Sequence, residues 1–183
     1  MKGRLNPILL LTLLPLCAFA QSDLGIAQYN ADGQLLQPAN LEEWIQTGAS
    51  LGSEYGEAPF DPQNPGAIGV VQMEPNAYRY FMEHGTYADG TIFLLSFFAA
   101  EGQSSPQLPG FVQGDMRAQE IHVIDKARFA DASGHAFFLF PTPETAASPR
   151  VMAGDCVVCH TEHGAFDGTF SQFYPRLRCR LTE

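Results

Sequence analysis

The sequence predicts an α+β fold, mainly an antiparallel β-sheet with a few flanking helices, in a single domain. The 183 residues include 17 glycines and 13 prolines, which divide the chain into short segments, as is typical of antiparallel β proteins. Several of these segments are rich in the β-branched and aromatic residues that favour strands. Without an N-terminal segment of 20 residues the chain has 163 residues, enough for one sizeable core and short for two.

The first half of the chain is expected to begin with a turn, a loop and a strand. The break at Pro38-Ala39-Asn40 precedes a short helix or turn over Leu41 to Gln46. Residues 53–65 are rich in glycine and proline and predict a loop. The mostly apolar run from Ala67 to Met73 predicts a strand.

A helix and the strongest strand of the chain are expected next. Pro75 suits the first turn of a helix that continues through Phe81, and Gly85 is its expected stop. Asp89-Gly90 predicts a turn. The aromatic and aliphatic residues from Thr91 to Ala100 then predict a strand.

The second half is expected to add a loop and two more strands. Residues 101–109 predict the loop, and Glu120 to Asp125 and Ala136 to Phe140 predict the strands. The turn between these strands falls on residues 131–134. Residues 141–149, bounded by prolines, lead into the last segment of the chain.

The N-terminus carries the pattern of a secretory signal peptide. Lys2 and Arg4 precede an apolar run over residues 8–16, and Ala18-Phe19-Ala20 has the small residues of a cleavage site. We expect cleavage after Ala20, a single domain over residues 21–183 and a periplasmic location. The apolar run is too short to span a membrane, and no later segment predicts a membrane span. A lipid anchor on Cys17 is the alternative, which the bulky Leu16 disfavours.

The charge of the chain excludes some classes of partner. The formal net charge is −10 and becomes −12 after cleavage, because residues 1–20 hold two basic and no acidic residues. Such a surface repels nucleic acid and anionic lipid. It would suit a cationic redox partner protein, and it is also an ordinary means of staying in solution.

The cofactor is predicted by Cys156-Val157-Val158-Cys159-His160, a C-x-x-C-H motif. In c-type haem attachment the two cysteines form thioethers with the porphyrin and the histidine is the proximal iron ligand. The signal peptide supports this, because bacterial haem attachment of this kind occurs outside the cytoplasm. We therefore predict one covalent haem c held by Cys156, Cys159 and His160. Cys179 is left over, and we expect a free thiol.

The position of the motif restricts the second axial ligand. Only 23 residues follow His160, so a sixth ligand must come from upstream or the iron is open on its distal side. A purely electron-transferring cytochrome with both positions filled is one alternative. Its ligand would be one of four residues, namely Met73, Met82, Met116 or His122.

Several separated motifs carry a family resemblance that covers nearly all of the chain after the signal peptide. In chain order they are Leu41-Glu42-Glu43-Trp44 with Gly48, Pro75-Asn76-Ala77-Tyr78, Asp89-Gly90-Thr91, residues 125–129, Cys156 to His160, and Asp167, Phe170 and Tyr174-Pro175. The chain resembles the cytochrome P-460 family and its relative cytochrome c'-beta. The resemblance implies a mostly antiparallel β fold, a covalent haem with a proximal histidine, and commonly a homodimer. Members of the family include enzymes that oxidise hydroxylamine and proteins that bind nitric oxide.

One departure from the family pattern bears on the chemistry. The resemblance implies that hydroxylamine-oxidising members carry a lysine, cross-linked to the porphyrin, on the strand after Asp-Gly-Thr. That place falls on Leu95, which cannot form the bond. Lys126, the one lysine after the signal peptide, does not match the position. We therefore expect no cross-link, which argues against hydroxylamine oxidation.

The distal pocket is predicted from strand alternation. Phe93, Leu95 and Phe97 share one face of their strand, and if Leu95 adjoins the haem all three wall the distal side. An apolar wall would leave a five-coordinate iron suited to small neutral ligands such as NO. The alternative is that these side chains are ordinary sheet core.

Polar candidates for the distal side are Glu120 and His122, which share a face two residues apart. Glu120 resembles the family's distal carboxylate and would carry protons if burial raised its pKa. His122 is a candidate proton donor or distal ligand; the alternatives are a rim carboxylate and a solvated histidine. His84 and His135 are expected at exposed turns, and His163 on the proximal side. The last arginines, Arg176, Arg178 and Arg180, predict a basic tail that is solvated or pairs with haem propionates.

Two classes of function remain. The favoured one is a periplasmic mono-haem c-type cytochrome that binds NO and/or transfers electrons to a redox partner protein. The alternative is a haem-dependent oxidoreductase, acting on hydroxylamine or another nitrogen oxide or with peroxidase-like chemistry, in which Glu120 moves protons. The absent lysine favours the first class.

Overall fold

The structure is a computed structural model that describes residues 24–52, 59–105, 107–140 and 155–181. The expected signal peptide, its cleavage site, Cys17 and residues 53–58 of the predicted loop at 53–65 lie outside these residues. Within the described ranges, none of the helices has the length and hydropathy needed to cross a lipid bilayer.

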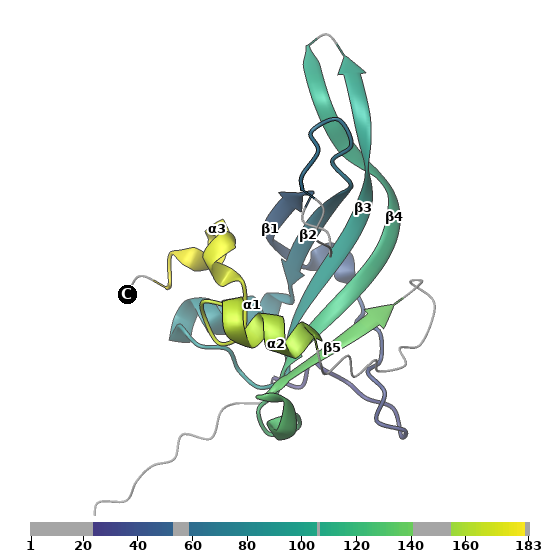
Figure 1. The fold of residues 1–183 in the computed structure, drawn as a ribbon. Coiled ribbons are helices and arrows are strands. Elements are labelled where there is room, and N and C mark those ends of the chain that lie inside the picture. Colours follow the sequence, from purple (N-terminus) through teal and green to yellow (C-terminus); the bar gives the residue numbers. More distant parts are fainter. Residues whose placement is uncertain (1–23, 53–58, 106, 141–154, 182–183) are drawn as a thin grey trace, which may run out of the picture.

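A five-stranded antiparallel sheet forms the centre of the molecule, with its strands in the order β1-β2-β3-β4-β5 (Figure 1). The strands are Ile45–Leu51, Ala67–Met73, Thr91–Ser105, Leu108–Ile124 and His135–Phe140. Each strand pairs with its neighbour in the sequence, which is the topology of a simple meander. Together with its three helices, the sheet confirms the predicted α+β class.

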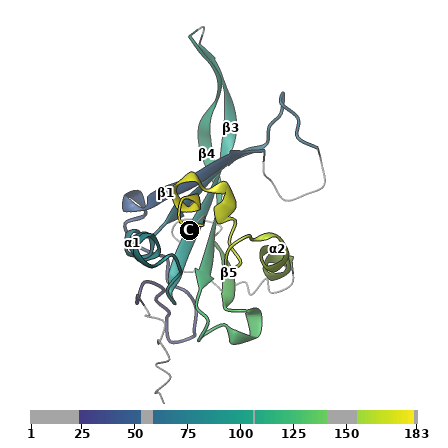
Figure 2. The same cartoon turned by 90° about the vertical axis from the view of Figure 1, so that its left-hand side faces the viewer.

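The β3–β4 hairpin is longer than the sequence predicted. Its pairing runs from Thr91 opposite Ile124 to Ser105 opposite Leu108, so residues 101–109 are mostly strand and the predicted loop was wrong. Beyond Ala100 the two strands pair only with each other and project past the rest of the sheet (Figures 1 and 2). Glycine and serine in this stretch resemble a loop, but continuous ladder pairing outweighs their low strand propensity.

The first strand was missed for a similar reason. The predicted helix or turn is limited to a 3-10 turn over Leu41–Glu43, after which β1 begins at Ile45. β1 contains Gly48 and Ser50 and shows no clean alternation, so pairing with β2 decides its conformation. A Cβ at Gly48 would lie 2.6 Å from Cδ1 of Tyr174, so the glycine lets the C-terminal segment pack closely on β1.

The helix α1 spans Pro75–His84, as predicted from its start and stop signals. Glu74 caps its N-terminus by accepting hydrogen bonds from the backbone N–H groups of Asn76, at 2.6 Å, and Ala77, at 2.8 Å. Gly85 ends the helix in the left-handed region, with φ of 70°, and its N–H donates to the Phe81 carbonyl.

The two faces of the sheet carry two separate cores. On one face the N-terminal segment covers a cluster of Leu35, Trp44, Ile92, Leu94, Ile121, Val123, Phe138 and Phe140. On the other face α1 and the C-terminal segment cover a cluster of Met73, Ala77, Phe81, Tyr87, Phe93, Ile124 and Leu177. The C-terminal segment comprises α2 (Asp155–His163), a 3-10 turn (Ser171–Phe173) and α3 (Pro175–Arg178). Figure 1 shows α2 and α3 on the same side of the sheet.

Candidate functional site

The C-x-x-C-H motif lies on α2, which places its three reactive side chains on one side of the helix. Cys156, Cys159 and His160 occupy positions i, i+3 and i+4, which are neighbours on a helix surface. Among the described residues neither cysteine forms a disulfide; Cys156 is half-buried and Cys159 is exposed. Both thiols are therefore accessible for covalent attachment of a ligand that lies along this face.

His160 is oriented by a hydrogen bond to the backbone of a later loop. Its Nδ1 lies 2.7 Å from the Gly168 carbonyl oxygen. A carbonyl only accepts, so the ring proton resides on Nδ1 and the lone pair on Nε2 is free for a metal. Burial lowers the pKa of His160 from its ordinary 6.5, although the bond to Gly168 opposes that shift. The ring is thus held in the neutral tautomer that metal ligation requires.

The loop that supplies this carbonyl is tightly built. Asp167 and Gly168 both have left-handed backbones, with φ of 45° and 62°. A Cβ at Gly168 would lie 2.6 Å from the His135 ring, and one at Gly164 would lie 2.4 Å from the His160 carbonyl oxygen. Only glycine fits at these two places, because each approaches a histidine or its backbone too closely for a side chain.

Three rings surround the imidazole of His160. The ring centroids of Phe137, Phe170 and His122 lie 4.6, 4.7 and 4.8 Å from that of His160. They come from β5, the 169–171 segment and β4, so three elements far apart in the sequence fix the ring plane. This packing restricts rotation of the imidazole about its side-chain bonds.

His122 and His135 form a buried pair beside His160. Nε2 of His122 lies 2.9 Å from Nδ1 of His135, and burial lowers the pKa of both rings from 6.5. The expectation that His135 is exposed was wrong, because it begins β5 opposite Ile124 and is 4% exposed. Strand alternation could have found it, had the predicted strand begun at residue 135 and not at residue 136.

The position of His122 also bears on its predicted role as distal ligand. Two imidazoles that bind one iron from opposite sides, each through a bond of about 2 Å, would have ring centroids about 6 Å apart. The observed separation of 4.8 Å is too short for that arrangement. In this structure His122 is therefore too close to His160 to be the axial ligand opposite it.

Three buried hydroxyls connect the 169–171 segment to the core. Thr169 donates to the Phe166 carbonyl at 2.8 Å, and its oxygen lies 2.5 Å from that of Ser171. The Ser171 oxygen in turn lies 2.5 Å from the Tyr87 hydroxyl. Each hydroxyl has one proton, so the bonds run from Tyr87 to Ser171 to Thr169. Burial raises the pKa of Tyr87 to about 12, which keeps its proton in place.

The predicted distal residues share the sheet face on which His122 and Phe137 lie. Register places Leu95 opposite Glu120, and Glu120 opposite Leu139. Leu95, Phe97 and Glu120 are half-buried, whereas Phe93 is 5% exposed and packs edge-on against Tyr87. Phe93 thus belongs to the core at one end of this face. Contact of Phe93, Leu95, Phe97 and Glu120 with a haem stays a prediction.

Other candidates lie in varied surroundings. Met73 is fully buried in the core and Met116 is 39% exposed on the hairpin. His84 and His163 are exposed, as is Cys179, whose thiol donates to the Arg176 carbonyl. In the C-terminal tail, Arg180 reaches back to the Glu83 carbonyl at the end of α1.

The donor set fits a covalently attached haem. Two accessible thiols lie one helical turn apart, and a neutral imidazole with a free Nε2 follows directly. Among the residues that the structure describes, no group of three or more His, Cys, Asp or Glu side chains could by itself hold a metal ion. A porphyrin, which brings four ligands of its own, needs only the axial imidazole from the protein.

The helical motif, the oriented imidazole and the antiparallel sheet define a protein of the haem-binding type. Residues 38–171 match the model of the family described as cytochrome P460, so the chain belongs to that family and is a haem cytochrome. No match was found among curated proteins.

Proposed function

We propose that this chain is an exported mono-haem c-type cytochrome that binds a small neutral ligand such as NO and exchanges single electrons with a redox partner protein. Cys156 and Cys159 would hold the haem through thioethers, and His160 would be the proximal ligand. The observation that supports this best is the 2.7 Å bond between Nδ1 of His160 and the Gly168 carbonyl, which leaves Nε2 available for iron. When bound, the haem supplies a redox-active iron that takes diatomic ligands.

The surroundings of His160 support a haem iron with one open coordination position. His122 lies too close to His160 to ligate opposite it, and Met73 is fully buried in the core. Leu95 and Phe97, on one face of their strand, offer half-buried apolar surface, and neither side chain has an atom that binds metal. Such a surface excludes water and favours a neutral ligand over a charged one.

Visible and resonance Raman spectra of the exported protein test this proposal. We expect a five-coordinate, high-spin ferrous haem, NO binding, and the mass of one haem bound to a chain that begins at Gln21. Cys159→Ala should leave one thioether and shift the reduced absorption bands, while Cys179→Ala should leave them unchanged. A six-coordinate, low-spin spectrum in both redox states would contradict the open site. Loss of the haem mass on denaturation would contradict covalent attachment.

A second candidate, oxidation of hydroxylamine or a related substrate, is favoured by the position of Glu120. This carboxylate lies between Leu95 and Leu139 in the register of the half-buried face, where it would take a proton from an N–H or O–H group. Steady-state turnover with hydroxylamine in wild type and Glu120→Gln tests it. Comparable rates in the two proteins would remove Glu120 from the chemistry, and no turnover in either would remove the activity itself.

A further inference from the structure

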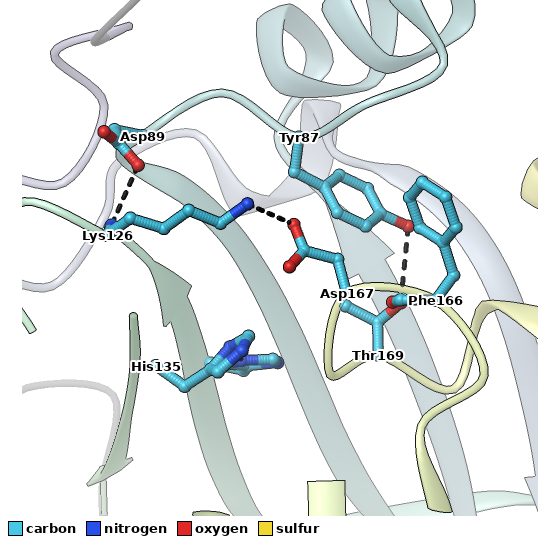
Figure 3. A network of polar contacts seen from close by, with 8 residues as sticks. Tyr87, Asp89, Lys126, His135, Phe166, Asp167 and Thr169 are labelled. Atoms are coloured by element: carbon cyan, nitrogen blue, oxygen red, sulfur yellow. Dashed lines mark hydrogen bonds and ion pairs between the residues drawn. The ribbon is translucent and has the colours of Figure 1, made fainter. Parts of the chain in front are cut away.

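Lys126 connects three separate segments near the histidine cluster, which consists of His122, His135 and His160. Its backbone N–H donates to Oδ1 of Asp89 at 2.8 Å, and its Nζ lies 2.9 Å from Oδ2 of Asp167 (Figure 3). Asp89 lies in the turn before β3, Lys126 follows β4, and Asp167 belongs to the loop after α2. The lysine thus ties the C-terminal loop to the end of the sheet.

Asp167, the residue whose carboxylate pairs with Lys126, has an unfavourable backbone conformation. Asp167 has φ of 45°, a region that residues with a Cβ rarely adopt. The pairing with Lys126 compensates for this conformation. Without the pair, Asp167 would be free to relax toward negative φ and to rotate the backbone that leads into Gly168.

That backbone sets the direction of the carbonyl bonded to His160. Gly168 directly follows Asp167, and its carbonyl oxygen accepts from Nδ1 of His160. On the far side of the carbonyl, Thr169 is fixed by its bonds to Phe166 and Ser171. The loop is therefore anchored after Gly168 by buried hydroxyls and before Gly168 by the ion pair.

We propose that Lys126 and Asp167 are positioning residues that align the Gly168 carbonyl with His160 and thereby tune electron donation from His160 to the haem iron. This inference rests on the axial role of His160 proposed above. A stronger Nδ1–H···O bond gives the imidazole more imidazolate character, which stabilises ferric over ferrous iron. Loss of the pair weakens the bond, raises the reduction potential and weakens the bond between iron and His160.

The reduction potential of the holoprotein separates this mechanism from simple electrostatics. Loss of a positive charge in Lys126→Ala would by itself lower the potential, whereas loss of alignment raises it. Asp167→Asn keeps the shape of the side chain and removes a negative charge. This variant raises the reduction potential both through the loss of charge and through the loss of alignment. We expect both variants to raise the potential, Lys126→Arg to stay near wild type, and the double variant Lys126→Ala/Asp167→Asn to shift no more than either single variant. The control is Arg79→Ala, which removes an exposed cation bonded to Asn76 on α1.

The iron–histidine stretching band of the ferrous protein gives a second readout, which a distant charge does not move. We expect a lower frequency in Lys126→Ala and Asp167→Asn and no change in Arg79→Ala. The pair is partly exposed, with side chains 45% and 27% accessible, so high salt should raise the wild-type potential more than that of the variants.

The outcomes distinguish this inference from the proposed function. A lowered potential in Lys126→Ala, or an unchanged stretching band in both variants, would overturn the positioning role while leaving the cytochrome intact. If wild-type protein carries haem but shows no iron–histidine band in the five-coordinate ferrous state and His160→Ala keeps the wild-type spectrum, the axial role of His160 fails, and the inference with it.

Discussion

His122 and His135 share a buried hydrogen bond of 2.9 Å, and the first of them packs edge-on against His160. A hydrogen bond between two ring nitrogens holds one proton, so one of the two nitrogens must be unprotonated and accept. The bond is therefore lost when both rings are fully protonated. Asp167 favours a positive charge on His135, but burial outweighs that effect and lowers the pKa of the ring. The pair therefore makes the folded state sensitive to acid.

Acid should destabilise the protein through these two rings. Burial lowers the pKa of both from 6.5, so below that pH the unfolded chain binds more protons than the folded one. Their contribution is complete above 6.5 and is lost as the pH falls toward the lowered values. We expect the urea midpoint to drop between about pH 6.5 and pH 5, and to drop less in His122→Phe/His135→Phe.

The matched control for that experiment is His84→Phe. His84 is exposed on α1, where Nδ1 lies 3.0 Å from the Tyr80 carbonyl. This variant should retain the full acid dependence of the wild type. An equal acid dependence in the double variant would show that other groups cause the loss of stability.

Gly168→Ala should destabilise the protein and reduce haem retention. A left-handed backbone costs a residue with a Cβ about 1–2 kcal/mol, and the new atom would also lie 2.6 Å from the His135 ring. Thermal unfolding and the haem-to-protein absorbance ratio measure both effects. Gly25 has the same left-handed backbone with open space around it. Gly25→Ala should therefore lose only the stability that the backbone conformation costs. Equal losses in the two variants would show that contact with His135 contributes nothing.

Tyr87→Phe should lower stability by about 1–3 kcal/mol, because it leaves the buried Ser171 hydroxyl without its donor. Above about pH 10 the unfolded tyrosine ionises while the folded one, with its pKa raised to about 12, keeps its proton. Wild-type stability should therefore fall between pH 10 and 12, and this part of the loss should be absent in the variant. Chemical unfolding at neutral and alkaline pH checks both. Tyr80→Phe, whose ring stacks on the exposed His84, should change little.

Phe97→Ala should speed ligand binding if this face borders the iron. The side chain lies above Gly69, where an added Cβ would contact both Leu95 and Phe97. Its removal opens half-buried apolar surface, and we expect a several-fold faster association of CO in flash photolysis. Phe98→Ala, on the opposite face of the strand, should leave the rate unchanged. Equal rates in wild type and Phe97→Ala would place the ligand path elsewhere.

Local signals in the sequence predicted some elements accurately. The bounds of α1 follow from Pro75 and Gly85, and β2 follows from a mostly apolar run. β1 and the outer half of the β3–β4 hairpin carry no such signals, since their strand conformation depends on pairing with a neighbour. Propensity alone cannot supply that information.

The residues of the candidate site show the same distinction between local signals and tertiary contacts. Cys156, Cys159 and His160 lie within five consecutive residues and were predicted from their spacing. Gly168 and His135 were not, because their roles arise from contacts with residues distant in the sequence. A glycine that accepts from a histidine through its carbonyl has no residue-type signature.

The projecting part of the β3–β4 hairpin leaves the outer backbone groups of both strands open to water. Residues 101–105 and 108–116 pair with a neighbouring strand on one side only, and neither core cluster includes them. Their amides should exchange with deuterium well before those at the Thr91–Ile124 end, because opening them exposes little apolar surface. The projecting part of the hairpin can thus open locally while the hydrogen bonds and packing of the histidine cluster, at the opposite end of the sheet, stay intact.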